Sequence, residues 1–377
     1  MLDIYKIKNS NVLVRVCYDL SNNHDISRIS DSKKTIQLLL KGGNKVILIS
    51  HWGRPEGKTN KQNSFKNLLQ IIEKELESNL EFLNQYQNSY SEIKKQITNS
   101  KNSLFILENS RFNPKENSSI DSERLALAKN YISLASYFID EAFPVSHRQE
   151  VTNFDIKKLL PSFLGLSYET EIDNLKKIKT NPEKPFLVIM AGAKLETKLP
   201  LITKMLPLAD KIILAGKLCF TFIQAAKELN LIKYASVDIG ESEIEDSFLE
   251  TAKSLLLQNP EKIVLPVDFI YGNEAGEVVN SSFKNKQAYD VGEKSLVNFT
   301  KILSTAKTIF WNGTLGYYEK NPFDKGTTEL ANFVGTLKNT FKVVGGGDTH
   351  SALSKETLSK FNFISMGGGA TLEYLSK

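Results

Sequence analysis

Short apolar runs alternate with amphipathic stretches along the whole chain, and this pattern predicts the fold class. The amphipathic stretches include residues 64–76, 123–133 and 291–303. The apolar runs lie at residues 12–16, 45–50, 104–108, 137–140, 186–190, 211–214, 262–267, 308–311, 341–344 and 363–365. Near-continuous apolar strands separated by amphipathic helices are typical of parallel sheets that are covered by helices on both faces. The pattern therefore predicts an α/β fold with doubly wound parallel sheets.

A charged, periodic segment at residues 167–184 (SYETEIDNLKKIKTNPEK) interrupts this alternation near the middle of the chain. It ends in a Pro-containing loop, and a strong apolar strand follows directly. We interpret the segment as a hinge helix that joins two doubly wound parallel-sheet domains, residues 1–168 and 169–365. Residues 366–377 form a C-terminal segment. The alternative is one large sheet that carries this segment as a surface helix.

The bulk composition narrows the class of protein. A chain of 377 residues suggests two or three domains, and 41% hydrophobic residues can bury substantial cores. The net charge is only +5, without a basic tail or an arginine-rich stripe, so we expect no nucleic-acid partner. No apolar run approaches the ~20 residues that span a bilayer, and the N-terminus does not resemble a signal peptide. Cys17 and Cys219 lie far apart and fit free thiols in a reducing compartment, so we expect a cytoplasmic protein without a membrane partner.

Three glycine-rich elements follow predicted strands in the second half. The first, residues 342–349 (KVVGGGDT), leads into a predicted helical run at 351–360, and the others are residues 366–371 (MGGGAT) and 191–194 (AGAK). Glycines let backbone N–H groups approach a phosphate, and a new helix presents its positive end. Asp348 is suited to hold Mg²⁺ and Thr349 to donate to a phosphate oxygen. The element is neither a Walker loop nor GxGxxG. A plain glycine-rich turn before a helix is the alternative interpretation of a single such element.

Basic residues follow successive predicted strands in the first half, as Arg28, His51 with Arg54, Arg111, and His147 with Arg148. Ligands of parallel α/β sheets bind outside the carboxyl ends of the strands, so these residues are expected at one edge. The planar guanidinium group suits phosphate and carboxylate. One such arginine by itself is more typical of a solvated surface, but the set predicts a pocket for a small, multiply anionic ligand.

Lys194 and Lys198 in the second half stand four residues apart, which would place both ammonium groups on one helix face. A solvated helix face is the alternative. The segment 311–319 (WNGTLGYYE) adds polar groups suited to a ribose at a strand end. The first domain is thus predicted to bind an anionic substrate and the second a nucleotide, and such an enzyme must close to bring its ligands together.

Eight collinear motifs resemble those of the phosphoglycerate kinase family, and together they cover nearly the whole chain. They are SHWGRP (50–55), ENSRF (108–112), FPVSHR (143–148), MAGAKLETK (190–198), LPVD (265–268), WNGTLGYYE (311–319), VVGGGDT (343–349) and SMGGGATLE (365–373). The resemblance implies reversible phosphoryl transfer from 1,3-bisphosphoglycerate to ADP, which gives 3-phosphoglycerate and MgATP, in a monomer with hinge-bending domains. It also implies that residues 366–377 return toward the first domain, although this tail looks short.

The resemblance also implies roles for individual residues. The phosphoglycerate would be held by Arg28, His51, Arg54, Arg111 and Arg148. The nucleotide would be bound by Lys194, Lys198, Gly216, Ala288, Asn312, Glu319, Gly346, Gly347, Asp348 and Thr349, with Asp348 holding Mg²⁺. The groups acting on the transferred phosphoryl group would be Arg28, Lys194, Lys198, Gly346 and Gly347. The accepting carboxylate is already ionised at pH 7, so this chemistry needs no general base.

The chain departs from the family pattern at several positions. An Asp-Phe-Asn pattern is replaced by Cys17-Tyr18-Asp19, so we expect Asp19 to supply the glycerate-binding carboxylate from the same strand face. Glu150 stands where the pattern has a second histidine, and its charge would repel a phosphate unless Arg148 or solvent satisfies it. These changes leave two alternatives open, which are a catalytically weak nucleotide-binding or interaction protein, and a kinase for a different small carboxylate.

Overall fold

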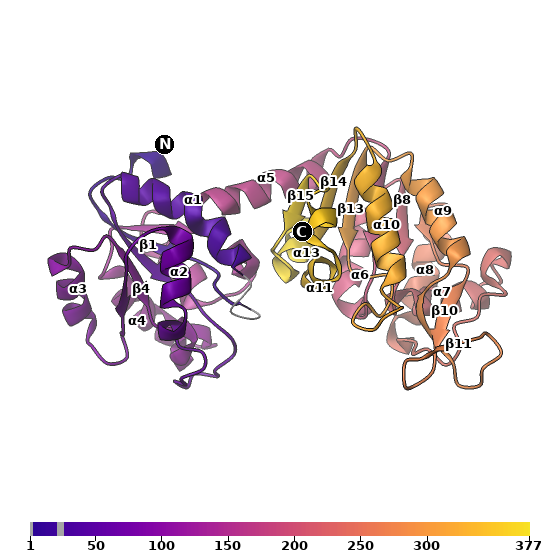
Figure 1. The fold of residues 1–377 in the computed structure, drawn as a ribbon, viewed down its shortest axis with the longest axis horizontal. Coiled ribbons are helices and arrows are strands. Elements are labelled where there is room, and N and C mark those ends of the chain that lie inside the picture. The colour runs from indigo at the N-terminus through magenta and orange to yellow at the C-terminus, as the bar shows by residue number, and fades with distance from the viewer. Residues whose placement is uncertain (1–2, 21–25) are drawn as a thin grey trace. The chain divides into compact units, whose positions relative to one another are not determined.

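The computed structural model describes residues 3–20 and 26–377 and divides the chain into two compact units, Met1–Asp173 and Asn174–Lys377 (Figure 1). The helix α5 (Leu166–Thr180) runs across this division, so the helix expected in the charged segment is confirmed. The domain limits 1–168, 169–365 and 366–377, and the role assigned to each part, stay predictions.

The first unit is built on one parallel sheet. Its strands are β1 (Asn11–Arg15), β2 (Lys45–Ile49), β3 (Leu80–Leu83), β4 (Leu104–Leu107), β5 (Tyr137–Asp140) and β6 (Ser162–Leu164). They pair in the order β3-β4-β2-β1-β5-β6, and every pairing is parallel. The carboxyl ends of these strands therefore meet at one edge of the sheet.

Helices cover both faces of this sheet because alternate side chains of each strand point to opposite sides. The helices are α1 (Ser27–Lys41), α2 (Leu69–Leu76), α3 (Tyr90–Asn99) and α4 (Asp121–Ile132). Val12 and Val14 pack in one apolar cluster with residues of α1 and α2. Leu13, between them, packs in another with residues of α3 and α4. The doubly wound prediction is confirmed for this unit.

The second unit contains a second parallel sheet, so the alternative of one large sheet is wrong. Its strands are β7 (Phe186–Met190), β8 (Lys211–Leu214), β9 (Ile263–Val264), β13 (Thr308–Asn312), β14 (Phe341–Gly345) and β15 (Phe363–Ser365), in the order β15-β14-β13-β7-β8-β9. The helices are α6 (Leu195–Met205), α7 (Leu218–Glu228), α8 (Leu249–Gln258), α9 (Glu293–Leu303), α10 (Lys325–Thr336), α11 (Gly347–Ala352), α12 (Lys355–Leu358) and α13 (Gly369–Ser376). Within residues 366–377, α13 packs against α6 of the same unit.

Several strands differ from the expectation. β3 and β6 were not anticipated, nor was an antiparallel sheet of β10 (Phe269–Gly272), β11 (Val278–Val279) and β12 (Gln287–Val291). These strands are short or carry polar and glycine residues, so they lack the apolar run that marks a buried parallel strand. β9 is shorter than the expected 262–267, and Pro266, which has no N–H for a ladder, follows soon after it.

Two local expectations are wrong. The helical run expected at 351–360 is divided into α11 and α12, because Leu353 is extended and the Ser354 hydroxyl accepts the N–H of Thr357 to begin α12. Cys17 and Asp19 do not share a strand face, since β1 ends at Arg15 and both residues lie in the segment after it. Cys17 and Cys219 are free thiols, as expected, and both are buried.

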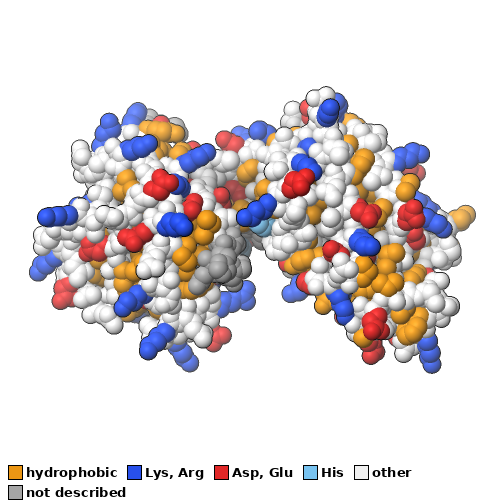
Figure 2. All heavy atoms as spheres, in the orientation of Figure 1, with side chains coloured by type: hydrophobic (Ala, Val, Ile, Leu, Met, Phe, Trp, Pro, Cys, Tyr) orange, Lys and Arg blue, Asp and Glu red, His pale blue; other side chains and the backbone are white. Residues whose placement is uncertain are grey.

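Charged side chains are distributed over both units. On the face drawn in Figure 2, the described acidic and basic side chains are interspersed across each of them. The arginines of the first unit that follow strands differ from these scattered charges because they share one edge of the sheet.

Candidate functional site

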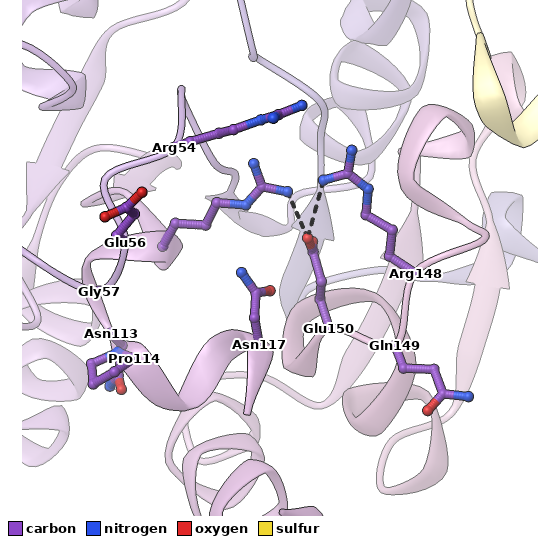
Figure 3. A pocket seen from close by; sticks show the side chains of 10 residues that line it. Arg54, Glu56, Gly57, Asn113, Pro114, Asn117, Arg148, Gln149 and Glu150 are labelled. Carbon is purple, nitrogen blue, oxygen red and sulfur yellow. Dashed lines mark hydrogen bonds and ion pairs between the residues drawn. The ribbon is translucent and has the colours of Figure 1, made fainter. Parts of the chain in front are cut away.

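A cavity of about 650 Å³ lies at the carboxyl edge of the first sheet (Figure 3). Its walls come from the segments that follow β2, β4 and β5, as expected for parallel strands. The lining residues are Arg54, Glu56, Gly57, Arg111, Asn113, Pro114, Asn117, Arg148, Gln149 and Glu150. Three of the arginines expected from sequence thus line one cavity, with Glu150 among them.

Glu150 is buried and is held by guanidinium groups on several sides (Figure 3). One carboxylate oxygen lies 2.6 Å from Arg111 Nη2 and 3.5 Å from Arg148 Nη1, and the other lies 3.3 Å from Arg15 Nη2. Burial acts to raise the pKa of Glu150, but the charges of Arg15 and Arg111, and that of His51 when it is protonated at low pH, lower the pKa to about 2. The carboxylate is therefore ionised. Its negative charge, which was expected to repel a phosphate, is balanced by Arg15, Arg111 and Arg148.

Arg15 is the central residue that sequence reasoning missed. It ends β1, is fully buried, and donates from Nε to Thr152 Oγ1 at 2.9 Å and from Nη2 toward Glu150. A cation that terminates an otherwise apolar strand (NVLVR) is the signal that could have identified it. Buried charges are retained when they are paired and hydrogen-bonded, and Arg15 meets that condition here.

His51 joins Arg15 to Asp19. Its Nδ1 lies 2.9 Å from Arg15 Nη2, and its Nε2 lies 3.5 Å from Asp19 Oδ2. A guanidinium group only donates, so Nδ1 accepts and the ring proton is on Nε2, facing the carboxylate. Burial lowers the pKa of His51 to about 4 despite the opposing hydrogen bond to Asp19, and the charges of Arg15 and Arg111 lower it further. His51 is therefore neutral at pH 7.

Asp19 and Arg28 form the other side of this network. Asp19 Oδ1 accepts the N–H of Gly53 at 2.8 Å, and Arg28 Nη1 donates to the Asp19 carbonyl oxygen at 3.0 Å. Burial acts to raise the pKa of Asp19, but the hydrogen bonds from His51 and Gly53 and the charge of Arg28 hold it below its usual value. Arg28 Nη1 also lies 3.3 Å from Cys17 Sγ. The Asp19 carboxylate therefore lies against His51 and Gly53, and it comes from the segment after β1.

The second unit has a cavity of about 430 Å³ at the carboxyl edge of its own sheet. Four residues of the expected nucleotide site line it, namely Gly216, Ala288, Glu319 and Asp348. The lining also includes Tyr317 and Tyr318 from the segment 311–319, and three aromatic side chains that sequence reasoning missed, which are Phe220, Phe269 and Tyr289. Aromatic side chains in a cavity wall suit a flat ring such as a nucleobase.

Lys198 lies on α6, close to two glycines. Its ammonium group donates to the carbonyl oxygen of Ala191. A Cβ atom added to Gly192 would lie 2.9 Å from the Lys198 Nζ, and one added to Gly313 would lie 2.6 Å from it, so a larger residue at either position would crowd the ammonium group. Burial lowers the pKa of Lys198 to about 8, although the charge of Asp348 acts to raise it. Lys194 is instead the exposed residue that precedes α6, so the expectation of two ammonium groups on one helix face is wrong.

The loop between β14 and α11 requires glycine for two different reasons. Gly346 has φ +101°, and a Cβ there would lie 2.9 Å from Asn312 Nδ2, which donates to the Gly345 oxygen at 3.0 Å. A Cβ at Gly347 would meet no atom within 4 Å, so open space lies over the start of α11. Thr349 is buried there, and its hydroxyl donates to the Gly345 oxygen and accepts the N–H of Gly313 at 2.8 Å. The Thr349 hydroxyl, which was expected to donate to a phosphate, thus donates to a backbone oxygen of its own loop.

Asp348 is an exposed carboxylate at this loop. Among the described residues, no group of three or more His, Cys, Asp or Glu side chains could hold a metal ion. A single carboxylate nevertheless fits Mg²⁺ that arrives with a nucleotide, since Mg²⁺ is commonly bound by one or two carboxylates plus substrate phosphates.

No helix in the described part of the chain is long and apolar enough to cross a bilayer.

Comparisons with known proteins identify what the chain is similar to. The family model described as phosphoglycerate kinase matches residues 2–377. The phosphoglycerate kinase of Corynebacterium glutamicum (strain R) is 34% identical over 395 residues, covering 98% of this chain and 94% of the relative. That of Coprothermobacter proteolyticus is 35% identical, with the same coverage. The solved phosphoglycerate kinase of Coxiella burnetii has a TM-score of 0.80 at 27% identity, covering 98% of this chain and 94% of that one.

Proposed function

The chain belongs to the phosphoglycerate kinase family, and we propose that its two cavities bind the two substrates of the reaction, one in each unit. Members of this family are phosphotransferases that transfer a phosphoryl group between 1,3-bisphosphoglycerate and ADP. The observation that carries the assignment of the first cavity is that Arg54, Arg111 and Arg148 all line it, each from the segment after a different strand. Guanidinium groups suit a phosphate or a carboxylate, and phosphoglycerate carries both.

In the first unit, Arg54 and Arg148 are proposed to contact the ligand directly. Arg54 is exposed and makes no ion pair with any residue that the structure describes, and the Arg148 side chain is 39% exposed. His51 and Asp19 are proposed to order the glycerate end. The buried His51 acts through its contacts, and the Asp19 carboxylate is partly open to solvent. Arg28, which donates to the Asp19 carbonyl oxygen, is proposed to face the transferred group.

In the second unit, the base is proposed to enter the aromatic-lined cavity beside Gly216 and Ala288, with Glu319 toward the ribose. Asn312 is buried and does not line the cavity, so it is proposed to support the site through its hydrogen bond to the Gly345 oxygen. The phosphates are proposed to lie over the open surface at Gly347, where the first N–H groups of α11 have no acceptor within the helix. Lys194 and Lys198 supply positive charge there. Asp348 would hold Mg²⁺, which neutralises phosphate charge when it is bound.

This residue set matches the chemical needs of the transfer. In the ATP-consuming direction a carboxylate oxygen of 3-phosphoglycerate bonds to the γ-phosphorus, and the bond from phosphorus to the ADP oxygen breaks. No proton moves, because the carboxylate is already ionised at pH 7. Catalysis then depends on positioning and on stabilising the charge of the moving group, a role proposed for Lys198, Arg28 and the glycine N–H groups. Ligands on separate units require a closing motion, for which we propose α5 as the hinge.

A coupled assay tests the proposed function. Purified protein is supplied with 3-phosphoglycerate, ATP and Mg²⁺, and formation of 1,3-bisphosphoglycerate is followed. We expect turnover that is lost when Mg²⁺ is chelated. A folded sample that binds MgADP without turnover would instead indicate a nucleotide-binding protein, and turnover of another acid alone would indicate a kinase for a different carboxylate. We also propose a cytoplasmic monomer; the two free, buried thiols suit a reducing compartment, and light scattering tests the mass.

A further inference from the structure

Glu150 is an acid in the wall of a cavity proposed to bind anions. Its backbone is fixed at the start of the short helical turn η6 (Val151–Asp155), where its N–H donates to Asn153 Oδ1 at 3.1 Å. The side chain turns inward and is 4% exposed. Figure 3 shows its carboxylate between two guanidinium groups that line the cavity. The dashed lines mark its ion pairs with Arg148 and with Arg111.

The three arginines hold this carboxylate unequally. Arg111 donates at 2.6 Å, also donates to the Gly53 oxygen at 3.0 Å, and is 7% exposed, so this contact is short and enclosed. Arg15 is fully buried at 3.3 Å. Arg148 lies farther away at 3.5 Å, and its side chain is the most exposed of the three. The Arg148 contact is therefore the one that an incoming anion can replace most easily, because water screens it most.

We propose that Glu150 acts as an internal competitor for the anionic ligand and thereby sets the affinity of this cavity for phosphoglycerate. In the free protein it occupies Arg111 and shares Arg148. A bound phosphate takes Arg148 and Arg54, while Glu150 keeps Arg111 and Arg15. The ligand thus meets fewer free guanidinium donors than the number of arginines suggests, and it also faces a fixed negative charge. This inference rests on the proposed function of the first unit.

The test compares two variants that each remove one negative charge from the same cavity. Glu150→Gln keeps the size of the side chain but removes the charge that occupies the arginines. Glu56→Gln is the matched control, because Glu56 lines the cavity, is exposed, and makes no ion pair with any residue that the structure describes. Isothermal titration with 3-phosphoglycerate, and separately with inorganic phosphate, measures Kd for the wild type and both variants.

We expect Glu150→Gln to lower Kd for 3-phosphoglycerate about tenfold, equivalent to ~1.4 kcal/mol. Glu56→Gln should change Kd by less than about twofold, because exposed charges are screened. The KM for 3-phosphoglycerate should fall in the first variant, and that for ATP should stay the same. An unchanged or higher Kd in Glu150→Gln overturns the inference and shows that the carboxylate orders the arginines for the ligand. An equal gain in both variants overturns it too, since net charge alone would then be responsible.

The variant also leaves the buried Arg15 without a charged partner, so its folding must be controlled. We expect Glu150→Gln to have a lower Tm than the wild type and to gain more Tm on addition of inorganic phosphate. If Glu150→Gln does not fold, Glu150→His provides the same comparison, with the same expected decrease in Kd. Arg54→Ala in the wild-type background separates the two hypotheses. If Arg54→Ala leaves Kd for 3-phosphoglycerate unchanged, the proposed substrate site and the inference both fail. If Arg54→Ala raises Kd, the substrate site stands, and the Kd values of the Glu150 variants then support or overturn the inference.

Discussion

Replacing Lys198 with methionine should raise the stability of the second unit and remove activity. The ammonium group is largely enclosed, and burial lowers its pKa to about 8, compared with roughly 10.4 for an exposed lysine. That difference corresponds to roughly 3 kcal/mol of unfavourable burial at pH 7, where the group is charged in both the folded and the unfolded state. Methionine keeps a similar shape without the charge but loses the hydrogen bond to the Ala191 oxygen, which offsets about 1 kcal/mol.

The expected net gain for Lys198→Met is therefore about 2 kcal/mol at pH 7, and it should depend on pH. The unfolded wild type binds more protons than the folded wild type between pH 8 and 10, so the free energy of unfolding of the wild type rises over that range. Methionine has no such dependence, so its advantage should disappear near pH 10. In the coupled assay kcat should fall about 10³-fold, because the variant lacks the cation that we propose stabilises the moving phosphoryl group.

Urea unfolding at pH 7 and pH 10 measures this difference. Trp311 is fully buried in β13, so its fluorescence reports the second unit once Trp52 has been changed to phenylalanine in all samples. Lys194→Met is the control for loss of a lysine beside α6; because Lys194 is exposed, its stability should change by less than ~0.5 kcal/mol. A Lys198→Met protein that is equally destabilised at both pH values would refute the buried-charge reasoning. A kcat within tenfold of wild type would refute the catalytic role.

Three further predictions concern separate parts of the chain. Asp19→Asn should raise KM for 3-phosphoglycerate about tenfold and more than KM for ATP, because the carboxylate that accepts the Gly53 N–H is neutralised; unchanged constants in the coupled assay would remove Asp19 from the site. Gly347→Ala should raise KM for ATP at least several-fold while unfolding within ~1 kcal/mol of the wild type, because the new methyl group enters open space; equal KM values would place the phosphates elsewhere. Burial raises the pKa of Glu141 to about 7, so the wild type loses stability as pH rises from about 4 through 7. Glu141→Gln should then gain up to about 3 kcal/mol relative to the wild type between pH 5 and pH 8 in urea unfolding, whereas a difference that is independent of pH would contradict the raised pKa.

Most of the strands that could be predicted are buried on both faces, and the half-buried edge strand β15 was found from its short apolar run. β5, β7 and β8 were expected within their observed limits because a strand covered by helices on both sides needs a continuous apolar run. β10 and β12 pair in an antiparallel sheet whose exposed positions tolerate polar residues, and their pairing depends on partners outside each strand. Their existence was therefore not visible in the local pattern.

The side chains of the proposed anion site divide in a similar way. Arg54, Arg111 and Arg148 could be placed together from sequence, because parallel strands bring their carboxyl ends to one edge whatever the details of packing. Whether each of these cations is free or paired could not be predicted. Glu150 was expected to repel a phosphate, but its pairing with Arg111 and with Arg15 depends on side-chain positions from β1, η3 (Ser110–Phe112) and the loop before η6.

The fold class, the two-part organisation and the family could be read from the chain without its structure, because periodicity and collinear motifs are local properties of the chain. The state of the charged groups, in contrast, follows only from the folded arrangement. The proton of His51 is placed on Nε2 by the guanidinium of Arg15. The pKa of Lys198 is lowered because its ammonium group is buried. Charges respond to distance and burial, and both arise from residues far apart in sequence that meet only when the chain is folded.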